Sequence, residues 1–244
     1  MTSSLRDSES LDWTSGDLIG FDLETTGLDL ERARPVSFAI CWINRGVVCS
    51  EQTSLVNPGI PIPPEATAIH GITTSQALEE GMDLQQATQY LVEQVLQAGK
   101  ARIPITGMNL SFDLTILDRL ARESCGNSLA ELGWSGPALD ALVLDRHCDR
   151  FRKGHRTLPA LCCHYGVPLF DAHRADADAR AATLVVLEIA ERYPELAGMD
   201  LERLYAAQVE WYREWAVSYS DWLVRTGKTG LGEIEHVWPI RVTR

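Results

Sequence analysis

The chain has 244 residues, of which 45% are hydrophobic and 23% are charged, a composition typical of a soluble globular domain with an appendage. No apolar run reaches the roughly 20 residues that a membrane helix needs, and no secretory leader is present, so we expect a cytoplasmic protein without a membrane partner. The formal net charge of −12 has the wrong sign for a protein that grips nucleic-acid phosphates unaided.

The composition along the chain predicts three parts. Residues 1–16 are rich in Ser, Asp and Glu, and we expect them to form a disordered tail. Residues 17–195 carry alternating strand and helix patterns, and we expect them to form one domain. Residues 196–244 contain four of the seven Trp residues, which predicts an aromatic-rich helical extension.

The first strand is predicted near residues 18–24 and ends in two carboxylates. Asp22 and Glu24 are separated by one residue, so both side chains leave the same face of an extended segment. Two neighbouring acids repel each other unless cations lie between them, and Mg²⁺ or Mn²⁺ prefers carboxylate oxygens. The alternative is a strand that simply ends in polar residues at the surface.

Two further strands are predicted at 36–44 and 46–56, joined as a hairpin around Asn44-Arg-Gly46. Cys41 and Cys49 fall within these strand patterns and are expected to be small core residues. None of the six cysteines forms a C-x-x-C pair, which argues against a zinc ribbon and favours free thiols in a reducing compartment.

Helices are predicted near 65–69 and 84–98, then a strand at 103–107 and a helix at 112–123. Asp113 therefore lies in the first turn of a helix that follows a strand. Chains of the α/β class place functional groups at the carboxyl ends of strands. The alternative is an acid that is favoured near a helix N-terminus by the helix dipole.

Another acid begins the last helix of the domain. Three elements are predicted here: a strand or strand-helix segment at 138–147 and helices at 157–165 and 176–193. Asp178 lies at the start of the last helix, and Asp176 is expected to be its N-cap. His173 lies in the preceding loop, where a lone histidine would usually be a solvated side chain.

Basic residues gather before this loop. They are Arg146, Arg150, Arg152, Lys153, His155 and Arg156. This stretch is a candidate for contact with a nucleic-acid backbone, and a solvated loop is the alternative. The acidic chain predicts weak, salt-sensitive binding, with another protein holding the substrate as one way to strengthen it.

The aromatic residues of the extension fall at helical spacing. Leu204, Trp211, Trp215 and Trp222 are predicted to share one helix face. We expect this face to pack on the preceding domain. The alternative is a docking or homodimer surface, because Trp is enriched at interface hot spots.

Together these pieces resemble the DnaQ-like 3′–5′ exonucleases, a family that includes the proofreading subunit of bacterial replicative polymerase, ribonuclease T and oligoribonuclease. Asp22 and Glu24 match the first motif of this family. Asn109-Leu-Ser-Phe-Asp113 matches the second motif, and His173 with Asp178 matches the third. The resemblance covers about residues 17–195 and implies an α/β, ribonuclease-H-like fold with a mixed central sheet, antiparallel opening strands and flanking helices.

Two smaller features fit the same resemblance. A sister branch of the family has Tyr four residues before the last Asp, where this chain has Arg174, so the histidine branch is indicated. Ile69-His-Gly-Ile-Thr73 and the segment beginning at Asp140 also look like family segments.

The resemblance implies hydrolysis of phosphodiester bonds at a 3′ end with two divalent ions, Mg²⁺ or Mn²⁺. Asp22, Glu24 and Asp178 would hold one ion, with Asp22 bridging to a second ion supported by Asp113. His173 would act as general base. The substrate-binding residues that it implies are Thr25, Thr26, Gly27, Leu28, His70, Asn109 and Phe112.

The sequence leaves three questions open. The substrate is expected to be single-stranded DNA, with an RNA exonuclease or oligoribonuclease as the alternative, because no residue reveals how the site treats a 2′-hydroxyl. A polymerase or replication partner is implied but not named. A binding module that has lost catalysis is a rival class, and the intact set of four acids and His173 counts against it.

Overall fold

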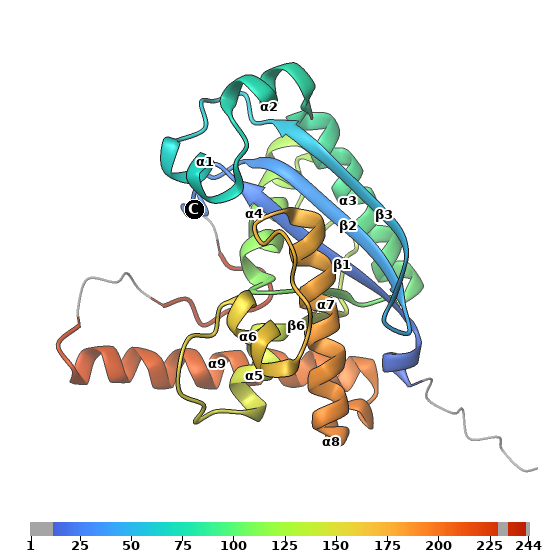
Figure 1. The fold of residues 1–244 in the computed structure, drawn as a ribbon, viewed down its shortest axis with the longest axis vertical. Coiled ribbons are helices and arrows are strands. Elements are labelled where there is room, and N and C mark those ends of the chain that lie inside the picture. Colours follow the sequence, from blue (N-terminus) through green and yellow to red (C-terminus); the bar gives the residue numbers. More distant parts are fainter. Residues whose placement is uncertain (1–11, 229–233, 243–244) are drawn as a thin grey trace, which may run out of the picture.

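The computed structural model describes residues 12–228 and 234–242, which form a six-stranded mixed sheet flanked by helices (Figure 1). The strands are β1 (Asp17–Thr25), β2 (Pro35–Asn44), β3 (Val47–Asn57), β4 (Met82–Asp83), β5 (Ile105–Gly107) and β6 (Ala138–Asp140). Their order across the sheet is β4-β3-β2-β1-β5-β6. The expected fold class, with antiparallel opening strands followed by α/β alternation, is confirmed.

The sheet changes direction at β1. β2 pairs antiparallel with both β1 and β3, whereas β5 pairs parallel with β1, and β6 pairs parallel with β5. The β2–β3 hairpin turns at Arg45 and Gly46, which both have positive φ as a tight two-residue hairpin turn requires. The carboxyl ends of β1, β5 and β6 consequently meet at one edge of the sheet.

The helices cover both faces of the sheet (Figure 1). They are α1 (Pro64–His70), α2 (Thr74–Glu80), α3 (Leu84–Ala101), α4 (Ser111–Cys125), α5 (Ala141–Cys148), α6 (Leu158–Tyr165), α7 (Ala175–Arg192), α8 (Pro194–Ala197) and α9 (Leu201–Arg225). The pattern did not predict α2, α8 or the two-residue β4.

Alternation along β1 divides the interior. Ile19, Phe21 and Leu23 are buried in the core with α3 and α4, whereas Leu18 belongs to the core on the other face, with α5, α6 and α7. Successive strand residues point to opposite faces. Asp22 and Glu24 therefore point to the α7 side of the sheet.

Two expectations near the surface are wrong. Residues 12–16 are not a tail: Trp13 lies in a short 3₁₀ helix (Trp13–Ser15), is 5% exposed and donates its indole N–H to the Leu196 carbonyl at 3.2 Å. Residues 1–11 lie outside the described residues. Cys49 is exposed rather than buried, because β4 covers only the far end of β3 and leaves its beginning at the sheet edge. Cys41 is buried as expected.

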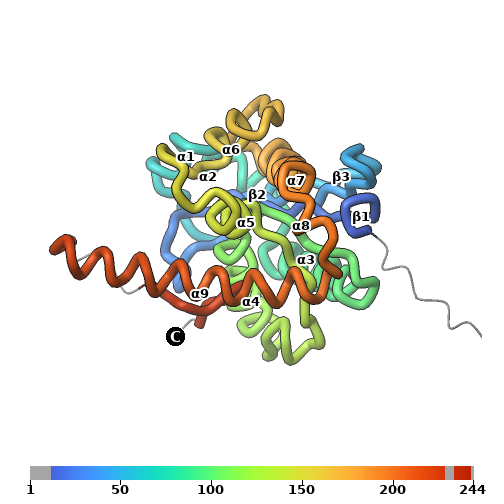
Figure 2. Tube along the Cα trace, turned by 90° about the horizontal axis from the view of Figure 1, so that it is seen from below, coloured from blue at the N-terminus to red at the C-terminus, as the bar shows by residue number. Residues whose placement is uncertain are grey.

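The extension forms one long helix that packs on the domain. α9 contacts α5 and β6 and then runs past the body of the domain (Figure 2). Its fully buried positions are Leu204, Gln208, Tyr212, Ala216 and Leu223, so the predicted inward face is displaced by about one residue. Leu204, Gln208, Tyr212 and Ala216 are spaced four residues apart and therefore lie on one face of the helix. The Trp side chains lie beside this face rather than on it.

In the described part of the chain, no helix combines the length and hydropathy needed to cross a membrane.

Candidate active site

Asp22 and Glu24 lie at the end of β1, on the face of the sheet that α7 only partly covers. Both are partly buried, while Phe21 and Leu23 between and beside them are buried on the opposite face. β1 reaches this edge as a central strand, since β2 and β5 pair with its two sides. The strand backbone is thereby fixed, and with it the direction of both carboxylates.

Asp113 reaches the same place from the first turn of α4. Its side chain is 5% exposed, and its Oδ1 accepts a hydrogen bond of 3.1 Å from the backbone N–H of Leu23. Leu23 lies between Asp22 and Glu24 in the sequence. This contact ties the second acidic segment directly to the first.

The third segment comes from α7 and the loop before it. Asp178 lies in the first turn of α7, and its Oδ2 accepts a 3.2 Å hydrogen bond from the backbone N–H of His173. His173 has a positive φ of 69°, a conformation that few non-glycine residues adopt and that marks a locally constrained turn. The bond to Asp178 holds this turn beside the acids.

Asp176 is not the expected N-cap. α7 begins at Ala175 with Arg174 in the cap position, and no side chain caps the helix there. Asp176 instead forms a two-pronged hydrogen bond with Arg174, at 3.1 and 3.0 Å. The helix begins one residue earlier than the pattern indicated, which moves Asp176 into the first turn.

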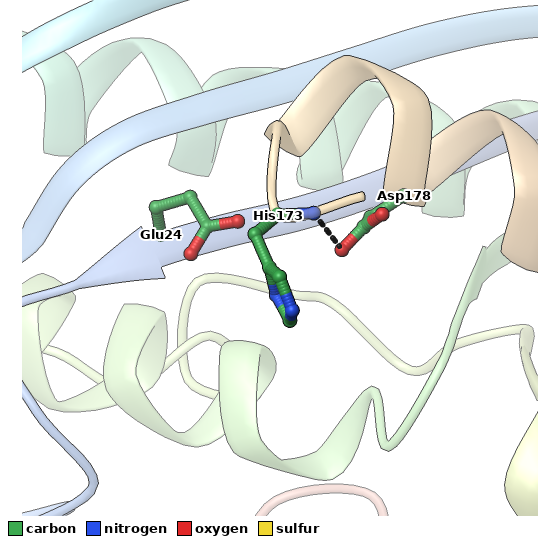
Figure 3. Close-up of side chains that lie close together, drawn as sticks. All are labelled: Glu24, His173 and Asp178. Atoms are coloured by element: carbon green, nitrogen blue, oxygen red, sulfur yellow. Dashed lines mark hydrogen bonds between the residues drawn. The ribbon is translucent and has the colours of Figure 1, made fainter. Parts of the chain in front are cut away.

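Three of these side chains converge closely. One potential ligand atom from each of Glu24, His173 and Asp178 lies within 4.8 Å of the others (Figure 3). The close-up shows Glu24 and Asp178 approaching from β1 and α7, with the imidazole of His173 between them. The Oδ1 atom of Asp178 is buried and has no hydrogen-bond partner among the described residues. An acceptor atom in that position is well suited to a cation.

The pKa values of all four acids are raised. Burial, followed by the charges of Asp113, Glu24 and Asp178, raises the pKa of Asp22 well above its usual value. Burial and the charge of Asp178 raise the pKa of Glu24 to about 8. The pKa of Asp113 also rises well above its ordinary range because of burial, although the Leu23 N–H opposes the shift. Burial raises the pKa of Asp178 as well.

This donor set fits divalent cations. Four hard carboxylates from three segments lie close enough to raise one another's pKa, and positive charge among them would relieve both their repulsion and their desolvation. Mg²⁺ and Mn²⁺ are the hard ions that such oxygen ligands select. The arrangement therefore has the chemistry of a metal centre at the edge of the sheet.

The Thr-Thr-Gly-Leu turn follows β1 directly beside these acids. Thr25 and Thr26 are buried: Thr25 donates its hydroxyl to the Gly27 carbonyl at 2.8 Å, and Thr26 accepts from the Arg34 N–H at 3.1 Å. Apart from the chain neighbours of Gly27, no atom of the described residues lies within 4 Å of the position that a Gly27 Cβ would occupy, and Leu28 is 86% exposed. The two threonines thus shape the turn, while Gly27 and Leu28 present an open surface.

The other three predicted substrate-binding residues have different surroundings. His70 ends α1, accepts the Ile72 N–H on its Nδ1 at 3.1 Å, and has a buried Nε2 without a partner among the described residues. Burial lowers the pKa of His70; the backbone of Thr25 opposes this shift, and the charge of His173 adds to it. Asn109 contributes its backbone N–H to an internal bond, and Phe112 packs partly against the core.

Asp140 is a buried acid that the sequence motifs did not single out as a site residue. Its side chain accepts hydrogen bonds from the N–H groups of Asn109 and Leu142, at 3.0 and 2.9 Å, and from the indole of Trp238 at 3.4 Å. It lies close enough to Asp113 to raise the pKa of that carboxyl. The sequence feature that could have identified Asp140 is its position as an acid at the end of a short apolar strand. Asp140 holds the turn that leads into α4 and hence supports Asp113.

With this geometry established, comparisons with known proteins identify the family. The profile of a family described as exonuclease, of the RNase T type, matches residues 19–186. The chain belongs to this exonuclease family. The matched span contains all four acids and His173, so the resemblance drawn from the motifs is confirmed.

Curated relatives of this exonuclease domain are larger proteins. The PolC-type DNA polymerase III of Lacticaseibacillus paracasei is 26% identical over 196 residues, which cover 80% of this chain and 13% of the polymerase. The 3′-5′ exonuclease DinG of Staphylococcus haemolyticus is 26% identical over 184 residues, covering 75% of this chain and 19% of that protein. The chain thus spans less than a fifth of the length of these relatives.

Solved structures share the fold. Exonuclease I of Methylocaldum szegediense superposes with a TM-score of 0.60 at 26% identity, covering 75% of this chain and 42% of that one. E. coli exonuclease I in complex with a dT13 oligonucleotide gives a TM-score of 0.63 at 21% identity, covering 74% and 42% of the two chains. The expected mixed-sheet architecture therefore agrees with exonucleases of known structure.

Proposed function

We propose that this chain is a metal-dependent 3′–5′ exonuclease that acts on single-stranded DNA and releases nucleoside 5′-monophosphates. The observation that carries the proposal is the convergence of Asp22, Glu24, Asp113, His173 and Asp178 at one sheet edge. These residues come from three segments that are far apart in the sequence. A fold without catalytic function has no reason to gather four mutually repelling carboxylates there.

The carboxylates would hold two divalent ions. Asp22, Glu24 and Asp178 would hold one, and Asp22 with Asp113 would hold the second. When bound, such ions supply an activated water and positive charge for the reacting phosphate. The unpartnered Oδ1 of Asp178 and the raised pKa of Glu24 support this assignment, since both conditions are relieved by a cation.

His173 would accept the proton of the attacking water. The backbone N–H of His173 donates a hydrogen bond to Asp178, whereas its ring forms no hydrogen bond within the described part of the chain. Imidazole is the side chain that exchanges protons near neutral pH. Exposure of His173 beside Glu24 and Asp178 leaves its ring open to solvent on the side where a strand end would enter.

The turn after β1 would receive the terminal nucleotide. Gly27 and Leu28 are open to contact, and Thr25 and Thr26 hold the turn in shape. His70, Asn109 and Phe112 would complete the pocket, with Phe112 offering an aromatic face to a base. The terminal nucleotide must leave its stack to enter, so single strands and frayed ends would be preferred.

DNA is the substrate that the relatives favour. PolC is a DNA polymerase, and the exonuclease I structures contain DNA oligonucleotides such as dT13. The polymerase relatives also suggest a replication setting for this chain, in which a larger protein would deliver the strand. An RNA exonuclease or an oligoribonuclease is the alternative that the experiment below addresses.

The test is degradation of 5′-labelled single-stranded DNA and RNA of the same sequence. With Mg²⁺ or Mn²⁺ we expect a ladder shortened from the 3′ end, faster for DNA, and no products in excess chelator. Asp22→Asn is the matched control, because it removes one charge without changing the size of the side chain. Degradation in chelator, or products shortened from the 5′ end, would contradict the proposal.

A further inference from the structure

The basic stretch before the third motif divides into two groups. Arg152 and Arg156 both bind the fully buried carboxylate of Asp145, Arg152 at 2.9 Å. Arg156 also donates to the backbone carbonyl of Asp149. These two guanidinium groups are neutralised and hold the loop. They are therefore poorly placed to bind a strand.

Arg146 and Arg150 form the second group. Neither guanidinium forms an ion pair or a side-chain hydrogen bond with any described residue. Arg146 lies over the indole of Trp215, with 3.5 Å between the guanidinium carbon and the ring centroid. Stacking fixes the plane of an arginine while leaving its N–H groups free to bind an anion. Such a guanidinium in a chain of net charge −12 requires an explanation.

Both arginines line a pocket between α5 and α9. The pocket has a volume of about 210 Å³, and we call it the α5–α9 pocket. Its walls include Arg146, Arg150, His147, Trp215 and Glu214. Two guanidinium groups therefore face one carboxylate, so the pocket attracts negative charge. Burial lowers the pKa of Arg146 to about 10, although the charges of Asp140 and Asp145 oppose the shift, and an anionic ligand would oppose it further.

The aromatic residues of α9 make the pocket rigid. The ring of His147 stacks on Trp211 with centroids 3.7 Å apart, and Trp215 stacks on Tyr219 at 5.4 Å. One turn farther, Trp222 carries the ammonium group of Lys228 at 4.6 Å from its ring centroid. Lys228 follows the end of α9, where the helix has left the body of the domain (Figure 2).

The pocket is connected to the active site through α5. This helix begins directly after Asp140, which raises the pKa of Asp113 and itself stabilises the charge of Arg146. The charge of Asp140 thus acts both on Asp113 of the acid cluster and on Arg146 of the pocket. A strand whose 3′ end occupies the site has further phosphates upstream of the scissile bond that need cationic partners.

We propose that the α5–α9 pocket binds phosphates of the substrate strand upstream of the scissile bond, through Arg146 and Arg150. This inference rests on the proposed exonuclease function and adds a second contact region to it. Arginine forks bind phosphate oxygens in pairs, and a positively charged groove that follows the backbone is the usual means of binding single strands. The pocket would compensate for an acidic surface that otherwise repels DNA.

The experiment compares two double variants in chelator, where no cleavage occurs. Arg146→Gln with Arg150→Gln removes two charges from the pocket, and Arg203→Gln with Arg213→Gln removes two from exposed positions of α9 outside it. Binding of labelled oligo-dT of about 16 nucleotides is followed by anisotropy across salt concentrations. We expect the pocket variant to bind about tenfold more weakly, with a salt slope smaller by about two. The control variant should bind like the wild type.

A second readout separates this inference from the proposed function. In Mg²⁺ the pocket variant should hydrolyse a dinucleotide at the wild-type rate, because a dinucleotide lacks the upstream phosphates that the pocket is proposed to bind, while KM for the long strand rises. If the wild type cleaves neither substrate, the proposed function fails, and the binding comparison still decides the pocket. The Arg150→Gln single variant changes an exposed residue, so a folding defect cannot account for its effect.

Three results would overturn the proposal. The first is equal affinity of the pocket variant and the wild type for the long strand. The second is an equal loss in the control variant, which would mean that net charge alone matters. The third is binding of dTMP that depends on Arg146 and matches the affinity of the long strand, which would make the pocket a mononucleotide site.

Discussion

Gly20 of β1 lies directly beneath Ala179 of α7. A Cβ at position 20 would stand 2.7 Å from the Ala179 carbonyl oxygen and 2.7 Å from the Thr183 hydroxyl, so only glycine allows this approach. Ala179 follows Asp178, and Gly20 precedes Asp22 by two residues. The contact therefore sets the distance between two of the acidic segments.

Gly20→Ala is expected to push α7 away from β1. Overpacking of this kind costs about 1–3 kcal/mol of unfolding free energy. Metal affinity should fall as well, since Asp178 moves with the helix. Urea unfolding and metal titration measure the two effects. Gly198→Ala is the matched control, because a Cβ there meets only ordinary contacts; equal losses in both variants would contradict this account.

Asp178→Asn should abolish turnover and weaken metal binding, because it removes one ligand charge without changing shape. The same change should raise the melting temperature of the metal-free protein, since Asp178 contributes to the raised pKa of both Asp22 and Glu24. Turnover assays, calorimetric metal titration and thermal melting in chelator test this. Loss of stability in chelator would show that the acid cluster is not strained by like charge.

His173→Ala should retain metal binding and lose roughly 10²–10⁴ in rate, the usual contribution of a general base. Asp176→Ala is the neighbouring control. It should leave the chemistry almost unchanged, because Asp176 forms its hydrogen bonds with the exposed Arg174 and reaches the acid cluster only through its charge near Asp178. Single-turnover rates of both variants at saturating metal decide the matter. Wild-type turnover in His173→Ala would refute the base assignment.

Metal binding should release protons at pH 7. The pKa of Glu24 is raised from 4.5 to about 8, so the metal-free folded protein carries a proton there that the unfolded chain does not. A raised pKa stabilises the protonated folded state. The contribution of Glu24 to the free energy of unfolding is therefore fully present below a pH of about 4.5 and is lost as the pH rises through about 8. Calorimetry in buffers of different ionisation enthalpy measures the release, which should be smaller in Glu24→Gln.

Truncation after residue 198 should expose core and leave the protein insoluble or far less stable to heat. Tyr212 and Ala216 of α9, together with Trp238, belong to the main hydrophobic core. Loss of a large buried aromatic side chain costs about 3–5 kcal/mol, a large part of a typical stability of about 5–15 kcal/mol. Melting and light scattering provide the test. An unchanged melting temperature with a smaller particle mass would indicate a partner-binding segment instead.

The local pattern of the chain determined the parts of the site that depend on neighbours in sequence. Alternation places Asp22 and Glu24 on one face of β1, and Asp178 and His173 lie together because only four residues separate them at a helix start. Helix and strand periods, together with the motif order, were sufficient for the fold class and the family.

Contacts between distant residues were decided only by the tertiary structure. The closeness of Gly20 to Ala179, the support of Asp113 by Asp140, and the capture of Arg152 and Arg156 by Asp145 each join different elements. A helical period predicts that α9 has an apolar face but not how the helix is rotated on the domain, because rotation depends on the shape of the surface beneath it. Periodicity is a property of one segment, whereas close packing is a property of two.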